Sequence, residues 1–268
     1  KVYAEKEVQD YDKVITYADK VIKTTGVELE DSYETLWGYD ETTKDCLKRN
    51  TKEGILEVHW TTGGGNWETW MYGRQLDNWD YYFTWAKWIT PSRDIISDFE
   101  KEGDEIRKNQ AIVYYACTWS NYYPASNYPF MYKLRSSYSN IYWIRLADII
   151  LMKAEAEAYK GNLDESAKLV NQIRKRAKLK ELTSDKTNSK EAMIEAVLHE
   201  RRLELAFEGE RWFDLCRNNK VEKYLNGIDN RDKGRIKQVK LFDSNSYLLP
   251  IPQTALDQNT NLVQNPGY

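Results

Sequence analysis

The chain has 268 residues, of which 41% are hydrophobic and 30% charged, so we expect a packed core and a solvated surface rather than disorder. The formal net charge of −3 excludes the basic excess that marks a nucleic-acid-binding surface. The chain contains 20 Tyr and 10 Trp but only 6 Phe. Tyr and Trp tolerate partly solvent-exposed sites because each carries a polar atom. The excess of Tyr and Trp over Phe therefore indicates a binding surface in addition to a core.

The first predicted helix covers residues 2–25. Its apolar residues recur at helical spacing, and Gly26 follows at a position typical of a helix end. Within it, residues 10–18 resemble the second helix of a tetratricopeptide-type hairpin.

Long aromatic-rich segments occupy residues 55–90 and 111–142. Short strands are predicted at residues 55–60 and 112–115, and a helix at 91–101, where Pro91 suits a first turn. The remainder is predicted as loop, and loops of this length in a compact domain are usually functional.

The sequence of residues 143–180 predicts a helical hairpin that is more complete than the hairpin-like segment at residues 10–18. Ile144 begins the apolar face of its first helix, Gly161 and Asn162 form the turn, and Asp164 caps the second helix. Residues 190–217 predict two more helices, which meet at a bend around Gly209. Residues 247–252 must be extended, because two prolines two positions apart forbid a helix there.

The stretch Glu200–Leu215 contains five acids and three arginines. Glu204 and Glu208 are a like-charge i, i+4 pair, which would repel unless arginines from this or another helix lie between them. One interpretation is a carboxylate pair for glycoside hydrolysis, but arginines this close would hold both groups ionised. We expect a structural ion-pair network instead, formed by Arg201, Arg202, Glu204, Glu208, Arg211 and Asp214.

The cysteines and histidines form no recognisable metal, disulfide or triad pattern. The residues are Cys46, Cys117, Cys216, His59 and His199. Residues 229–234 faintly resemble a calcium loop but lack its later acidic positions. We therefore expect no metal and no cofactor. The sequence contains no run of about 18 apolar residues, so it predicts no membrane-spanning helix.

Four motifs, in order, resemble those of the SusD/RagB family. Residues 90–99 (TPSRDIISDF) resemble its PT-x-x-LVD-x-F element, and residues 144–156 (IRLADIILMKAEA) resemble its RYAEVLLM-x-AEA helix. Glu200–Leu215 resembles its RR-x-EL-x-FEG-x-R signature, and residues 249–268 resemble its PIP … QNPGY ending. The resemblance implies a mainly α fold, with tetratricopeptide-like helix pairs, long irregular aromatic-rich loops and little β structure.

The resemblance also implies a function. Family members are surface glycan-binding lipoproteins of Bacteroidota, on the outer leaflet of the outer membrane. They pass oligosaccharides to a SusC-like TonB-dependent transporter without catalysis. They are typically longer, so we expect a C-terminal half or a short form whose lipid-anchored segment is absent here.

Within residues 1–268 we expect a single SusD-like domain with four parts. Residues 1–54 would form a tetratricopeptide-like helix and connection, and residues 55–142 a variable aromatic loop region. Residues 143–217 would form the hairpin and signature helix, and residues 218–268 an extended C-terminal segment.

Aromatic residues supply the candidate ligand site. Six of the ten Trp fall in residues 60–88, and an indole or phenol ring can stack on the apolar face of a pyranose while amides and carboxylates bond its hydroxyls. The candidate glycan-binding residues are Trp67, Trp70, Tyr72, Arg74, Asn78, Trp79, Tyr81, Tyr82, Trp119, Asn121, Tyr122 and Tyr123. The alternative is that these rings only cover irregular loops. The residues assigned to the core are Trp85, Trp88, Trp143 and Trp212.

Two other functions compete with glycan binding. A tetratricopeptide-type protein-interaction scaffold would bind peptides in a groove between helices and would need no exposed loop tryptophans. A helical glycosidase would need two carboxylates held apart across a cleft.

Overall fold

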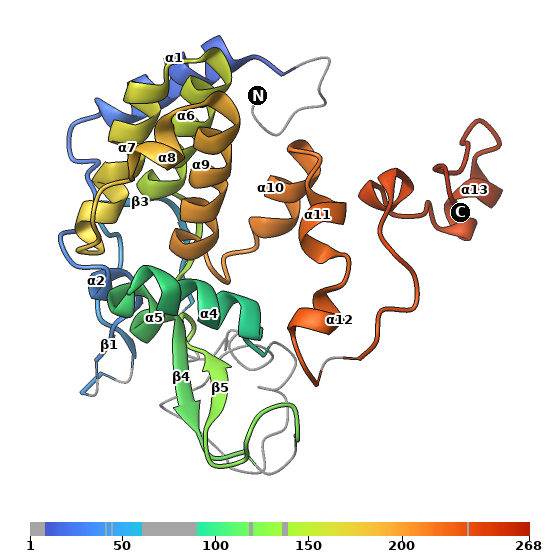
Figure 1. The fold of residues 1–268 in the computed structure, drawn as a ribbon, viewed down its shortest axis with the longest axis horizontal. Coiled ribbons are helices and arrows are strands. Elements are labelled where there is room, and N and C mark those ends of the chain that lie inside the picture. The colour runs from blue at the N-terminus through green and yellow to red at the C-terminus, as the bar shows by residue number, and fades with distance from the viewer. Residues whose placement is uncertain are drawn as a thin grey trace.

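The computed structural model describes residues 9–40, 42–43, 45–60, 90–117, 120–135, 139–234 and 236–268. This part of the chain is mainly helical and contains three two-stranded antiparallel sheets. Figure 1 shows long helices packed together in one body, a β hairpin within residues 112–131 projecting below them, and the C-terminal helices to their right. The predicted mainly α class with little β structure is confirmed.

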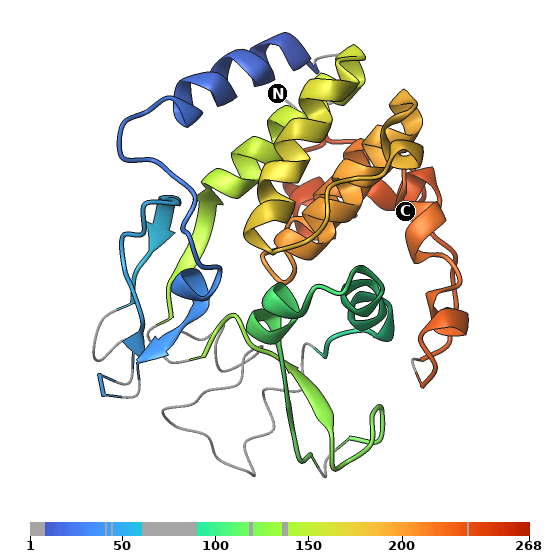
Figure 2. The ribbon, with the colours of Figure 1, turned by 60° about the vertical axis from the view of Figure 1, so that its left-hand side comes forward.

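The helical body is built around α6 (Leu146–Lys160), which packs against three other long helices. These are α1 (Tyr11–Ile22), α7 (Leu163–Arg176) and α9 (Lys190–Glu204), with the short α8 (Ser184–Thr187) beside them. Figures 1 and 2 show this group from two sides. Ala154, Ala156 and Ala158 on α6 are fully buried, and their short side chains let the neighbouring helices approach closely. The main apolar core lies here.

The hairpin of α6 and α7 is confirmed, with two corrections. The αL residue Gly161 (φ 86°) ends α6, but Asn162, and not Asp164, stands at the N-cap of α7. Asp164 lies in the first turn instead, where its charge suits the helix dipole. Ile144 belongs to the strand that precedes α6, because Arg145 at the α6 N-cap is still extended.

Helix α1 differs from the predicted 2–25 segment. It begins after Asp10, whose side chain accepts a hydrogen bond from the Lys13 backbone N–H at 3.0 Å. It ends at Ile22, before the turn that contains Gly26 (φ 85°). Residues 2–8 of the predicted helix lie outside the described residues.

The described strands form three antiparallel pairs. The predicted strands at 55–60 and 112–115 are confirmed as β3 (Gly54–Val58) and β4 (Ile112–Tyr115). Their partners, which the sequence did not predict, are β6 (Ile141–Arg145) and β5 (Tyr128–Met131). A third small pair consists of β1 (Tyr39–Asp40) and β2 (Asp45–Cys46), after the short helix α2 (Glu34–Trp37).

The helix predicted at 91–101 is confirmed as α4 (Arg93–Glu102). Its N-cap is Ser92, which accepts from the Ile95 N–H at 3.3 Å, so Pro91 precedes the cap and does not open the first turn. The αL residue Gly103 ends α4, and α5 (Glu105–Ala111) follows and leads directly into β4.

The chain turns sharply after α9. Phe207 and Gly209 both have positive φ, 66° and 90°, and they separate α9 from α10 (Arg211–Arg217), which agrees with the predicted bend. The following segment was predicted as extended, but it contains α11 (Val221–Leu225), α12 (Ile228–Arg231), the 3₁₀ helix η3 (Ser244–Tyr247) and α13 (Gln253–Gln258). The Leu248 and Pro252 backbones at the proline-rich motif are extended, as their sequence requires. Within the described ranges, none of the helices combines the length and the apolar character needed to cross a membrane.

Candidate functional site

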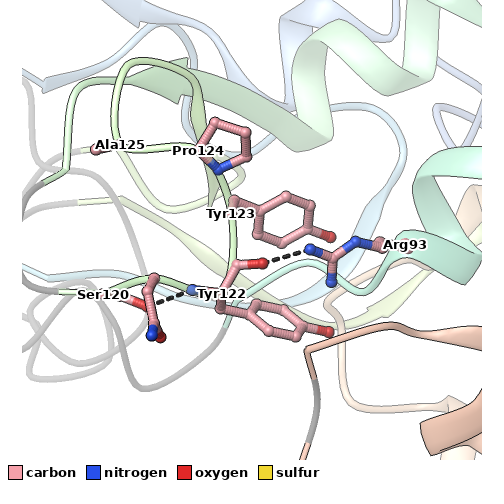
Figure 3. A pocket seen from close by; sticks show the side chains of 7 residues that line it. Arg93, Ser120, Tyr122, Tyr123, Pro124 and Ala125 are labelled. Atoms are coloured by element: carbon pink, nitrogen blue, oxygen red, sulfur yellow. Dashed lines mark hydrogen bonds between the residues drawn. The ribbon is translucent and has the colours of Figure 1, made fainter.

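Most of the predicted glycan-binding residues lie outside the described residues: Trp67, Trp70, Tyr72, Arg74, Asn78, Trp79, Tyr81, Tyr82 and Trp119. The same holds for Trp85 and Trp88, which were assigned to the core. Asn121, Tyr122 and Tyr123 are described. They lie together on the loop between β4 and β5 and line an open pocket of about 910 Å³, shown in Figure 3.

The β4–β5 hairpin positions this loop. The strands pair from Ile112 with Met131 to Tyr115 with Tyr128, so residues 116–127 connect them at the far end. The Cys117 N–H donates to the Ala125 carbonyl at 2.7 Å, and the Asn127 N–H donates to the Pro124 carbonyl at 3.0 Å. These bonds close the loop and hold its aromatic residues next to the start of α4.

Arg93, the first residue of α4, packs against both tyrosines of the loop. The Tyr122 and Tyr123 rings meet edge to face, with centroids 4.8 Å apart and planes at 83°. The Arg93 guanidinium carbon lies 4.6 Å from the Tyr122 centroid and 4.2 Å from the Tyr123 centroid. Such cation–π contacts are stronger where the site excludes water. Figure 3 shows the guanidinium beside the two rings.

A polar clamp fixes these groups. Asp232, which directly follows α12, is fully buried and accepts from Arg93 Nη1 at 3.1 Å and from the Arg93 backbone N–H at 3.3 Å. The Tyr122 hydroxyl donates to the same carboxylate, and Arg93 Nη2 donates to the Tyr122 carbonyl. The Tyr123 hydroxyl donates to the Pro91 carbonyl at 2.8 Å. The loop, the start of α4 and the end of α12 therefore form one hydrogen-bonded unit.

The segment that faintly resembled a calcium loop supplies this clamp. Asp232 binds Arg93 and Tyr122, while Asp229 accepts from the Gln238 backbone N–H at 3.0 Å. Among the residues that the structure describes, no group of three or more His, Cys, Asp or Glu side chains is arranged to hold a metal ion. Cys46, Cys117 and Cys216 are not joined by disulfides. Sequence reasoning missed Arg93 and Asp232 as parts of the site, because 139 residues separate them and no local pattern links them.

A second groove, of about 790 Å³, runs beside β6, the bend after α9 and helices α10 and α11. Trp143 and Phe213 line it and remain 66% and 56% exposed. The assignment of Trp143 to the core is therefore wrong. Trp143 follows the buried Tyr142 on β6, and successive strand residues point to opposite faces. Trp212 is half-buried, and its ring centroid lies 6.0 Å from that of Phe242.

Four charged residues of Glu200–Leu215 are fully buried, namely Glu200, Arg201, Glu204 and Asp214, and no charged residue of the stretch lines the loop pocket. Glu204 is fully buried and accepts from Arg145 Nη1 at 2.6 Å and from Arg107 Nη1 at 3.2 Å, and it also pairs with Arg176. Arg145 donates to Glu208 at 2.7 Å and so lies between the two glutamates. Arg145 of β6 therefore separates the like-charge pair, while Arg107 of α5 and Arg176 of α7 add further cations to Glu204.

The other residues of the stretch have partners on several elements. Arg201 pairs with Asp148 at 2.7 Å and with Asp214 at 3.0 Å. Arg202 pairs with Asp98 of α4 at 3.1 Å. Arg211 differs, because it donates to the Leu198 carbonyl at 3.2 Å and stacks on the Tyr224 ring.

The electrostatics of this interior cluster suit a structural role. Burial alone would raise the pKa of Glu204, but Arg176, Arg145 and Arg107 outweigh it and hold that pKa below the usual range. The pKa of Glu208 is also lowered, because Arg145 and Lys133 outweigh its burial. Burial lowers the pKa of Lys133 to about 8. A general acid for glycoside hydrolysis needs a raised pKa, so neither carboxylate suits that chemistry.

The sequence model of the SusD family matches residues 52–268. The chain belongs to the SusD family. This confirms the resemblance inferred from the four motifs. A curated relative, SusD-like protein P38 of Formosa agariphila, is 39% identical over 136 residues, an alignment that covers 48% of this chain and 25% of that relative.

Solved structures show the same fold. A SusD homolog from Bacteroides thetaiotaomicron superposes with a TM-score of 0.73 at 20% identity, covering 100% of this chain and 61% of that one. Surface glycan-binding protein A of the same species, in complex with laminarihexaose, superposes with a TM-score of 0.67 at 18% identity, covering 95% of this chain and 59% of that one. This chain thus spans less than two thirds of the length of these two solved proteins.

Proposed function

We propose that this chain binds oligosaccharides at the bacterial cell surface and delivers them to a SusC-like TonB-dependent outer-membrane transporter. Family membership supports this function, as does the laminarihexaose complex of a protein with the same fold. The observation that carries the proposal is the open pocket at the β4–β5 loop, where Asn121, Tyr122 and Tyr123 lie together.

The chemistry of the pocket suits sugars. Tyrosine rings offer apolar surface to the C–H face of a pyranose, and the exposed Asn121 amide can both donate to and accept from hydroxyl groups. Sugar hydroxyls exchange bonds to water for bonds to protein with little net gain, so we expect modest affinity. Modest affinity suits release to a transporter, and no catalytic step is part of the proposal.

The proposed site extends to aromatic and polar residues beyond the described part of the chain. We retain as its further members Trp67, Trp70, Tyr72, Arg74, Asn78, Trp79, Tyr81, Tyr82 and Trp119. We also propose that the protein acts on the outer leaflet of the outer membrane as a lipid-anchored protein.

A glycan array followed by isothermal titration tests the function. The array carries uncharged and acidic oligosaccharides, and the strongest ligand is titrated into the wild type and into Asn121→Ala. We expect Asn121→Ala to weaken binding several-fold, because the sugar loses an amide partner. The matched control is Asn188→Ala, at an exposed residue that follows α8 and does not line the pocket, and it should bind like the wild type.

The same titration applies to Trp67→Ala, Trp70→Ala and Trp79→Ala. Each should weaken binding without unfolding the chain, because loss of a stacked ring costs contact with the sugar but no core packing. Unchanged affinity in all three would remove these residues from the site. Retention of a protein partner without any glycan binding would favour an interaction scaffold instead.

A further inference from the structure

We propose that Asp232 makes the loop pocket selective for uncharged oligosaccharides by neutralising Arg93. This specificity rests on the proposed glycan-binding function. Among the described residues that line the pocket, Arg93 alone carries a charge. The electrostatic character of this side of the pocket therefore depends on how the Arg93 charge is compensated.

Asp232 compensates that charge from outside the pocket. Its carboxylate is fully buried, lies 3.1 Å from Arg93 Nη1, and is not among the lining residues. The Arg93 side chain remains 32% exposed, so a ligand in the pocket meets a guanidinium that already has its counter-ion. A carboxylate or sulfate on the ligand would gain attraction from Arg93 but meet repulsion from Asp232.

Two N–H donors of the Arg93 guanidinium are bonded within the protein. Nη1 donates to Asp232 and Nη2 to the Tyr122 carbonyl, while the guanidinium packs against both tyrosine rings. An acidic sugar that drew the Arg93 guanidinium towards itself would separate it from Asp232. This would leave a buried carboxylate without its cation, which is strongly unfavourable. Uncharged hydroxyl groups do not draw Arg93 away from Asp232.

The Tyr122 hydroxyl also bonds to Asp232. It donates to the second oxygen of Asp232, so one carboxylate holds both the cation and the phenol of the pocket wall. Replacing Asp232 by Asn keeps the size of the side chain but removes its charge. The variant Asp232→Asn therefore presents an uncompensated guanidinium to the ligand.

The test compares ligands that differ only in charge. Laminarihexaose, cellohexaose and maltohexaose are arrayed beside their C6-oxidised forms, which carry carboxylates on the same linkages. We expect the wild type to prefer the uncharged member of each pair that it binds. In Asp232→Asn, we expect affinity for the oxidised member to rise roughly tenfold relative to its uncharged partner, as one unit of uncompensated charge near a protein surface implies.

A matched control is available between the same two helices. Asp94 of α4 pairs with Arg231 of α12 at 3.3 Å, and neither residue lines the loop pocket. Asp94→Asn removes a more exposed Asp–Arg pair and should keep the wild-type ratio of affinities. The ratio is compared within one sample, so partial unfolding of a variant does not change it.

A second variant separates charge from structure. The double variant Arg93→Met/Asp232→Asn removes both charges and should restore the preference for the uncharged ligand, even if overall binding weakens. An equal loss of affinity for the charged and the uncharged ligand in Asp232→Asn would mean that Asp232 only supports the loop. That result would overturn the proposal. An acidic sugar as the strongest array ligand of the wild type also overturns it and leaves the glycan-binding function standing. Absence of binding to every glycan overturns both.

Discussion

Glu204 is a buried carboxylate that meets three arginines from three elements. Arg107 of α5, Arg145 of β6 and Arg176 of α7 all lie within ion-pair distance of it, and none of the four side chains is more than 5% exposed. A buried charge is tolerated only when it is paired and hydrogen-bonded. The glutamate therefore matters most as the common counter-ion of cations that water cannot reach.

We expect Glu204→Gln to lower the free energy of unfolding by about 3–5 kcal/mol, because it leaves buried guanidinium groups without part of their counter-charge. Urea denaturation measures the change. The control is Glu105→Gln, at a 63% exposed glutamate 3.9 Å from Lys108, where we expect a change below about 1 kcal/mol. Equal changes in the two variants would contradict this account of Glu204.

At the scale of elements, the short helix α11 is held to α9 largely by charge. Val221 is its single fully buried residue. Glu195 of α9 accepts from Lys220 at 2.7 Å, from Lys223 at 2.6 Å and from the Tyr224 hydroxyl. A helix this short has little stability of its own, so these bonds fix the start of the C-terminal segment against the helical body.

The α9–α11 contact should weaken in acid. Burial would raise the pKa of Glu195, but hydrogen bonds from Lys220, Lys223 and Tyr224 outweigh it and lower that pKa from 4.5 to about 2. A carboxyl whose pKa is lower in the folded state contributes its full stabilisation when the pH is above its unfolded-state pKa. It contributes none when the pH is below its folded-state pKa. We therefore expect the wild type to melt above Glu195→Gln at neutral pH, with a gap that closes between pH 4.5 and about 2. Thermal melts across that range measure it, and a constant gap would contradict the prediction.

At the scale of the whole molecule, the last residues form a small self-bonded module beside the helical body. The Gln264 side chain accepts from the Ile251 N–H at 2.7 Å and donates to the Ile251 carbonyl at 2.9 Å, as a neighbouring strand would. Asn265 donates to the Leu249 carbonyl at 2.6 Å, and the Tyr268 hydroxyl donates to the Leu248 carbonyl at 3.1 Å. The QNPGY ending thus closes onto the proline-rich motif.

We expect Gln264→Ala to open this module without unfolding the body. Hydrogen exchange at Ile251 and its neighbours should accelerate, because the amide loses its partner, while α6 and α9 keep their protection. Mass spectrometry of peptides from 245–268 measures the effect. Gln253→Ala serves as the control, since its amide bonds only the Asp257 side chain on the same helix. Faster exchange throughout α6 would show instead that the module supports the whole fold.

Local signals predicted the helices better than the contacts between elements. The apolar spacing of α6 and α7 and the αL glycine at 161 are encoded within a few residues, and both features are present in the structure. Strand β6 was read as the start of α6 because its motif continues into the helix, and so Trp143 was misplaced in the core. The Arg93–Asp232 clamp could not be predicted, because only the folded chain brings those residues together.

Arg145 bears on how the chain assembles. Its carboxylate partners Glu53, Glu204 and Glu208 are 92, 59 and 63 residues away in sequence. An intermediate that buried Arg145 before these segments arrived would hold a lone cation away from water, at a cost of several kcal/mol. We therefore expect the junction of β3, β6 and α9 to close in one late step, with partly assembled states hydrated there. It follows that these three elements should unfold in a single cooperative transition.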